Sequence, residues 1–141
     1  FVAARAVSDR HLNTLEQALL ADFISEGHFD QHLRRMRTLY AERQAALVEA
    51  AEHLWAGLID IQPGHAGLHV VGRLEPGIDG KRIARQADAA GVTSVPLSAF
   101  AVRPLRRDGL ALGYAAYTPR ELRKAAAKLA PILEQAHLAS E

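Results

Sequence analysis

Three arginines in a predicted loop, residues 97–107, are the best candidates for binding chemistry in this sequence. They are Arg103, Arg106 and Arg107. A guanidinium presents planar pairs of N–H donors that match a carboxylate or a phosphate. We therefore predict that these three side chains form an anion-binding, substrate-binding group, with simple solvation of the loop as the alternative.

The other chemically capable residues form no catalytic set and no metal site. His28 and His32 have the i, i+4 spacing of two ligands on one helix, but no carboxylate stands at a matching position. The serines lie in no nucleophile-elbow motif, and no glycine-rich loop precedes a helix. The lysines are Lys81, Lys124 and Lys128, and each falls on a polar helix face where a desolvated amine is not expected. We predict no catalytic residue and no metal ligand.

Composition and charge are those of an ordinary globular domain. The 141 residues are 49% hydrophobic and 23% charged, with 17 Lys+Arg against 16 Asp+Glu, a net charge of +1 and no cysteine. A near-neutral chain has no overall attraction to nucleic acid or membrane, so we interpret the basic cluster at residues 34–37 as a solvated helix face. No apolar run approaches the roughly 20 residues of a membrane span, and no signal peptide is recognisable, so we expect a cytoplasmic protein. The chain opens at Phe1, and we expect it to be a piece of something longer.

Two helices are predicted at the start of the chain. The first begins at a cap on Asp9 and ends at Gly27, and it carries an apolar stripe formed by Leu12, Leu15, Leu19, Leu20, Phe23 and Ile24. The second spans residues 29–55, with an apolar face at Leu33, Met36, Tyr40, Leu47, Ala51 and Leu54. We expect the first stripe to associate with a second copy of the chain, forming a homodimer through the N-terminal helix.

The rest of the sequence alternates short strands and helices. Strands are predicted at residues 58–61, 67–74, 92–95 and 110–117. A helix capped by Asp79 ends at Gly91, and a last helix begins at Thr118 with Pro119 and Glu121 in an N-terminal capping signature. Pro131 should kink this last helix or start a separate turn. The order predicts an α+β fold, with a small sheet covered by helices behind long N-terminal helices.

Several segments resemble fold-type I aminotransferases. LEQALLADFISEGHFDQHLRRMRTLYAERQAAL is similar to the helical region that follows the cofactor lysine of that family. GLHVVGRL resembles its Gly-Gly-aromatic strand, VPLSAF its Pro-Gly-Ser-x-Phe turn, and GLALGYAAYTPREL the strand and closing helix that follow. HLRRMR with GLALGYA is closest to MocR-type regulators of the GntR superfamily, in which a winged-helix DNA-binding domain is fused to an aminotransferase-like domain.

The resemblance implies a domain assignment and a cofactor. Residues 1–26 would be the tail of the large domain that binds pyridoxal phosphate, and residues 27–141 the C-terminal small domain. The family's lysine, aspartate and phosphate cup lie upstream of Phe1, so we expect no cofactor and no transaminase activity in this chain, and pyridoxal phosphate in the parent protein. The resemblance also places Ala111 where aminotransferases carry the arginine for the substrate carboxylate.

These observations leave three functions open. The first is a fragment of a pyridoxal-phosphate-dependent, effector-sensing domain of a transcriptional regulator, with an amino compound as effector and DNA bound only through an N-terminal domain absent from this chain. The second is the small domain of a genuine aminotransferase. The third is a structural or oligomerisation module.

Overall fold

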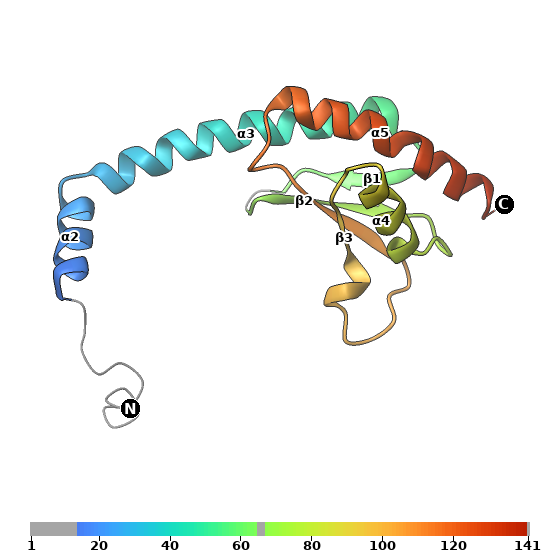
Figure 1. Cartoon of the computed structure of the whole chain (residues 1–141), viewed down its shortest axis with the longest axis horizontal. Coiled ribbons are helices and arrows are strands. Elements are labelled where there is room, and N and C mark those ends of the chain that lie inside the picture. Colours follow the sequence, from blue (N-terminus) through green and yellow to red (C-terminus); the bar gives the residue numbers. More distant parts are fainter. Residues whose placement is uncertain (1–13, 65–66, 141) are drawn as a thin grey trace. The chain divides into compact units, whose positions relative to one another are not determined.

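The computed structural model describes residues 14–64 and 67–140, which form the helices and strands drawn in Figure 1. They divide into two compact units, Phe1–Thr38 and Leu39–Glu141. The predicted cap at Asp9 and the first stripe residue, Leu12, lie outside the described residues. The domain boundary proposed for the parent protein, between residues 26 and 27, stays a prediction.

The first unit contains helix α2, Thr14–Ser25, and the start of helix α3, His28–Leu54. Gly27 separates the two helices at a φ of 81°, a conformation that glycine adopts without strain. No residue of α2 is buried. Phe23 packs against the rings of His28 and Phe29, with centroids 5.9 and 6.4 Å away. The apolar stripe is therefore present, and nothing in the described chain covers it.

Within the second unit, α3 contributes the buried residues Ala46, Leu47, Ala50 and Ala51. The prediction that Leu54 belongs to this apolar face is wrong, because Leu54 is 40% exposed. The helix ends there, and the next residue, Trp55, is 1% exposed instead. Its indole Nε1 donates a hydrogen bond of 2.9 Å to the carbonyl of Ala126, which gives the buried N–H a partner.

An antiparallel sheet of four strands, in the order β1-β2-β4-β3, forms the centre of the second unit. The strands are β1 Ile59–Gln62, β2 His69–Leu74, β3 Val95–Pro96 and β4 Gly109–Gly113. Both β3 and β4 are shorter than predicted. In β3, only Val95 and Pro96 pair with β4. Strand β4 ends at Gly113, which lies opposite His69, the first residue of β2. Residues beyond these points have no strand partner.

Two further helices complete the fold. Helix α4, Gly80–Ala89, is capped by Asp79, which accepts a hydrogen bond from Lys81 N, as predicted. Helix α5, Pro119–Leu138, begins with the predicted capping box between Thr118 and Glu121. Of the two outcomes predicted at Pro131, the separate turn does not occur, because α5 continues through this residue. The proline is exposed, while Leu129 and Leu133 on either side of it are buried in the core.

The core lies between one face of the sheet and helices α3, α4 and α5. Strand β2 alternates strictly, with Val70, Gly72 and Leu74 buried and the intervening residues exposed. Leu110 and Leu112 of β4 face the same core. One sheet face is thus covered by helices, which confirms the predicted α+β class. Among the described residues, no helix is long and apolar enough to cross a membrane.

Candidate functional site

The candidate site is the sheet face that carries no helix, which we call the open face. Residues directly opposite each other in antiparallel strands point to the same face. The register therefore places on one surface the side chains that alternate with the core residues. They are Asp60, Gln62, His69, Val71, Arg73, Val95 and Ala111.

Ala111 lies at the centre of the open face. It pairs with Val71 of β2 on one side and with Val95 of β3 on the other. These two valines are 39% and 36% exposed, so the row is an apolar floor in contact with solvent. The position that the resemblance matches to a carboxylate-binding arginine is therefore a short apolar side chain on an accessible surface.

Three charged or titratable side chains lie around this apolar row: Asp60, His69 and Arg73. His69 pairs with Gly113, and its ring lies over that glycine, since a Cβ added there would be 3.4 Å from His69 Cδ2 and Nε2. At the other end Arg73 pairs with Gly109 of β4, and on its other side with Asp60 of β1. Diagonal neighbours in such a ladder are roughly 7–8 Å apart, which brings the Arg73 guanidinium within reach of Ala111. The open face can thus hold a compact apolar group with an anion beside it.

Asp108 connects the arginine-bearing loop to the sheet. Its carboxylate accepts hydrogen bonds from Ser98 N, Ser98 Oγ and Gly109 N at 2.8–2.9 Å, and from Gly80 N at 3.1 Å. Partial burial raises the pKa of Asp108, but the hydrogen bonds from Gly109, Ser98 and Gly80 outweigh it and hold the pKa below its usual value. A side chain at Gly80 would collide with this carboxylate, at 2.7 Å.

The loop arginines are not equivalent in the structure. Arg107 is half-buried, and its Nε donates a 3.0 Å hydrogen bond to the carbonyl of Leu74 at the end of β2. Arg103 and Arg106 are exposed. Arg107 therefore holds the loop against the sheet, whereas the other two guanidiniums are available to an anion. A role for the three in substrate binding stays a prediction.

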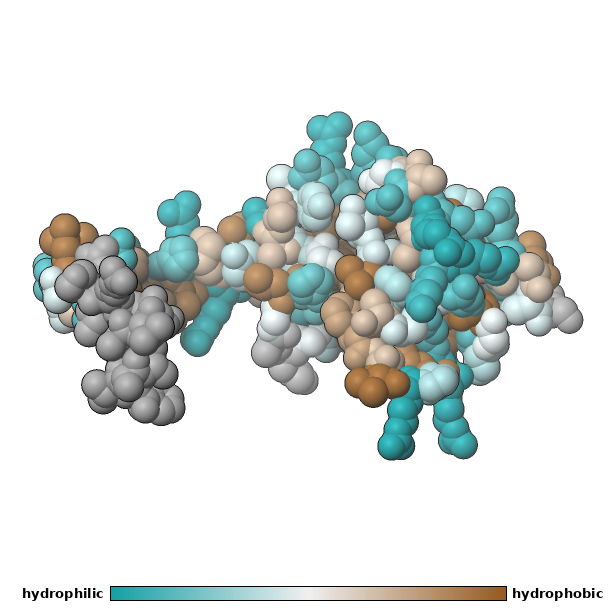
Figure 2. All heavy atoms as spheres, turned by 60° about the horizontal axis from the view of Figure 1, so that its bottom comes forward, coloured by the Kyte–Doolittle hydropathy of each residue, from teal (hydrophilic) through white to brown (hydrophobic). Residues whose placement is uncertain are grey.

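The loop also adds apolar surface beside the open face. The short 3₁₀ helix η1, Leu97–Phe100, and the residues after it lie on the opposite side of the sheet from α3 and α5 (Figure 1). Phe100, Val102 and Leu105 are 71%, 102% and 42% exposed. Figure 2 shows apolar side chains gathered on this side of the second unit, with hydrophilic side chains projecting beside them.

Sequence reasoning missed His69 and Arg73 as members of the site. The signal was available, because both alternate with the buried residues of β2 and so share a face with Val71. What the sequence could not give was the pairing partner that sets them beside Ala111. The histidine pair at residues 28 and 32 is exposed, and no group of three or more potential metal ligands occurs in the described part of the chain.

Comparisons with known proteins agree with the expected family. No protein-family model matches the chain. The chain is 41% identical over 110 residues to the probable rhizopine catabolism regulatory protein MocR of Rhizobium meliloti, a match covering 78% of this chain and 22% of that protein. It is 26% identical over 133 residues to aromatic-amino-acid aminotransferase 1 of Thermococcus litoralis, covering 94% and 32% of the two chains.

The chain is also similar to a solved aminotransferase structure. The multiple substrate aminotransferase of Thermococcus profundus matches with a TM-score of 0.87 and 26% identity, over 97% of this chain and 34% of that one. The chain therefore has the fold of an aminotransferase small domain. Its likeness to MocR-type regulators and to aminotransferases, expected from the sequence, is confirmed. The chain spans about a fifth to a third of the length of these relatives.

The described residues do not by themselves fit a pyridoxal phosphate site. An aldehyde cofactor needs a lysine amine, and the chain's three lysines lie on α4 and α5. None belongs to the open face. The open face has an apolar centre with polar groups at its sides, so it could contact a bound ligand. It lacks the lysine amine that would hold the cofactor.

Proposed function

We propose that this chain is the small domain of the effector-sensing part of a MocR-type transcriptional regulator. In this proposal the parent protein binds pyridoxal phosphate and DNA through segments outside this chain. The open face closes over a bound amino compound, and that closure biases the conformation that the DNA-binding part reads. A cytoplasmic location belongs to the same proposal.

The observation that carries this proposal is Ala111 at the centre of the open face. Two valines flank it, so that an α-carboxylate placed there would meet apolar side chains on either side, and the guanidinium of Arg73 only from a diagonal position. A bidentate pair of guanidinium and carboxylate is among the stronger polar interactions in proteins. Its absence favours a ligand other than an ordinary α-amino acid, and favours sensing over general transamination. The 41% identity to a MocR regulator supports the same function.

Substitution of Ala111 by arginine in the full-length protein tests this assignment. If Ala111 faces the bound amino compound, Ala111→Arg should improve binding of amino acids by about 1.5–3 kcal/mol, the contribution of a well-placed charged hydrogen-bonding pair. Calorimetric titration with a series of amino acids measures the change. Ala116→Arg is the matched control. Ala116 is exposed in the turn after β4, so this substitution adds the same charge outside the open face.

The assignment fails if Ala111→Arg leaves the binding of every amino acid unchanged or weaker. It also fails if Ala116→Arg improves binding equally, because the gain would then come from net charge alone.

The second candidate is the small domain of a genuine aminotransferase. The TM-score of 0.87 to the multiple substrate aminotransferase, over 97% of this chain, favours it. Arg73, Arg103 and Arg106 would then have to replace the missing arginine at position 111. Steady transamination by the full-length protein, lost when these arginines become glutamine, would establish this alternative. A winged-helix domain upstream of Phe1 would favour the regulator.

The proposal includes a homodimer formed through α2. Large apolar side chains on this helix are 41–69% exposed: Leu15, Leu19, Leu20, Phe23 and Ile24. Soluble monomers rarely expose a contiguous apolar surface of several hundred Å². A second copy of the chain would cover the stripe in a closed two-fold arrangement.

A further inference from the structure

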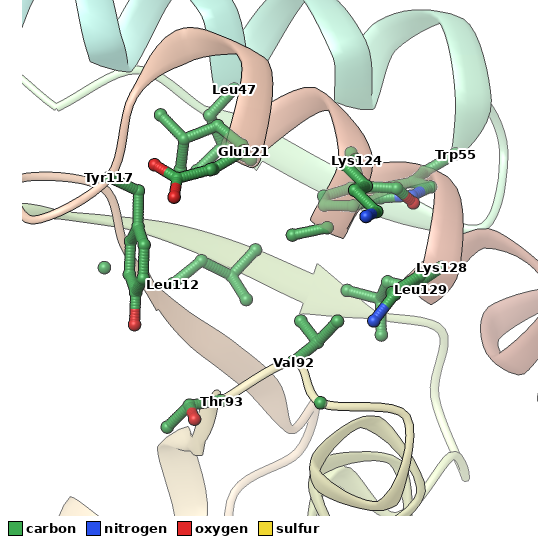
Figure 3. Close-up of a pocket in the computed structure, with 15 residues that line it drawn as sticks. Leu47, Trp55, Val92, Thr93, Leu112, Tyr117, Glu121, Lys124, Lys128 and Leu129 are labelled. Carbon is green, nitrogen blue, oxygen red and sulfur yellow. The ribbon is translucent and has the colours of Figure 1, made fainter.

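A cavity of about 260 Å³ is lined by Leu112 on the helix-covered side of the sheet (Figure 3). Ala111 is the neighbouring residue of β4, so its side chain lies on the other face. Its walls come from α5, β4, the end of α3 and residues 91–93. Apolar side chains make up most of the lining: Leu47, Trp55, Val92, Leu112, Leu122 and Leu129. All of these residues belong to the second unit. The cavity uses none of the open-face residues.

Two ammonium groups border this apolar space. Lys124 and Lys128 of α5 both line the cavity, and Figure 3 shows them on the same side as Trp55 and Leu129. Lys128 Nζ donates a 2.8 Å hydrogen bond to the carbonyl of Ala90, which leaves further donors on that nitrogen. Within the described residues, Lys124 forms no hydrogen bond or ion pair. The structure therefore leaves unused positive charge beside the cavity.

One acidic residue, Glu121, also lines the cavity, and it lies away from the two lysines. Figure 3 shows Glu121 on the other side of the cavity, next to Tyr117 and Leu47. Its carboxylate accepts hydrogen bonds from Thr118 N and Oγ, at 2.8 and 2.7 Å, and so serves as part of the α5 cap. The cavity thus has an apolar interior, a cationic side and an acidic group already engaged elsewhere.

We propose that this cavity is a second binding site, for a small carboxylate with a compact apolar body. The apolar walls match a ring or a short branched chain, and the lysines match the carboxylate. The volume is just below the roughly 300–1,000 Å³ of sites for drug-sized ligands, which limits the ligand to about one ring. The site is separate from the open face and does not depend on the function proposed for it.

Trp55 makes the proposal directly measurable, because it is the only tryptophan of the chain and it lines the cavity. We expect titration of the 141-residue chain with phenylacetate to give a saturable change in tryptophan fluorescence. The neutral isostere phenylacetamide should bind about three- to fivefold more weakly, since it lacks the charge that pairs with a partly solvated lysine.

Two variants distinguish the site from nonspecific binding. Lys124→Met removes one charge while keeping the apolar stem, and should weaken phenylacetate binding about three- to fivefold. Lys81→Met is the matched control on α4, outside the cavity, and should leave binding unchanged. Ala125→Leu fills the cavity without changing charge and should abolish the fluorescence change while the chain stays folded by circular dichroism.

Three results would overturn the proposal. The first is the absence of a saturable response to phenylacetate in the folded wild-type chain. The second is equal binding of phenylacetamide. The third is a loss of affinity in Lys81→Met as large as that in Lys124→Met, which would mean that overall charge attracts the ligand.

Discussion

Helices α2 and α5 both carry several large apolar side chains, but only those of α5 are buried. In α5 the apolar positions are buried against the sheet and the neighbouring helices: Leu122, Ala126, Leu129, Ala130, Leu133 and Ala136. In α2 not one residue is buried. Apolar side chains at helical spacing predict that a helix forms, but their burial requires a partner surface. Of these two helices, only α5 packs against such a surface within the described chain.

The two helices therefore contribute to different properties of the chain. Burial of a large apolar side chain is worth about 1.5–3 kcal/mol, so α5 stabilises the fold of the second unit. The apolar side chains of α2 are exposed and contribute no such burial within the described chain, so their burial free energy is available only to an interaction with another surface. The two helices should therefore respond oppositely to substitution, in stability for one and in association for the other.

The largest expected effect is on stability, at the centre of α5. Leu129 is fully buried, and Leu129→Ala should lower the free energy of unfolding by about 2–5 kcal/mol through lost burial and the cavity left behind. Leu19→Ala, at a 60% exposed position of α2, should lower it by less than about 0.5 kcal/mol. Urea unfolding of both variants measures the difference. Similar losses in the two would contradict the comparison.

A smaller effect is expected at the start of α5. Thr118 Oγ accepts a hydrogen bond from the backbone N–H of residue 121, and Thr118→Ala should reduce the free energy of unfolding by about 1 kcal/mol. Thr118→Ser keeps the accepting oxygen and should retain most of the stability. If the serine variant loses as much as the alanine variant, the threonine contributes through packing and the cap is unimportant.

The same cap predicts a dependence of stability on pH. Hydrogen bonds from the Thr118 backbone and hydroxyl lower the pKa of Glu121 below its ordinary value of 4.5. A carboxylate whose pKa is lower in the folded state stabilises the fold above the unfolded pKa, and this contribution is lost as the pH falls through the folded pKa. The wild-type chain should therefore lose more stability than Glu121→Gln below the unfolded pKa. Parallel slopes in urea unfolding at several pH values would refute this.

The smallest effect on stability, and the largest on association, is expected in α2. Leu19→Glu combined with Phe23→Glu should weaken the proposed dimer while changing the unfolding of the second unit by less than about 0.5 kcal/mol. Ala18→Glu combined with Ala21→Glu places the same charges on the opposite side of the helix and should leave the dimer intact. Sedimentation equilibrium measures both, and a monomeric wild-type chain at high micromolar concentration would rule out the dimer.

The sequence predicted most of the local structure because local chemistry decides it. The capping box at Thr118, the cap at Asp79 and the helix end at Gly91 each depend on a few neighbouring residues, and each occurs as expected. The alternation in β2 likewise identifies its buried face. Ala111 could be placed in the candidate site only because the resemblance supplied an alignment.

The remaining features depend on contacts between distant segments. Trp55 replaces Leu54 in the core because its indole reaches Ala126, 71 residues away in the chain. Helix α5 passes through Pro131 because buried neighbours hold it on the sheet. The network of Asp108 joins Gly80 and Ser98, which no local pattern connects. His69 and Arg73 could be assigned to the candidate site only from the register of β2 against β4, which is also a contact between distant segments.

The bonds of Asp108 have a consequence for how this domain can diversify. Two of the four hydrogen bonds that Asp108 accepts come from Ser98 and close the segment from Ser98 to Asp108. One of them comes from a backbone N–H group, which every residue except proline provides. Exposed side chains between these two residues, such as Phe100, Val102 and Arg103, take no part in the closure. The exposed side chains of the segment can therefore be changed while its ends stay fixed, so that the surface beside the open face can be altered without loss of the closure.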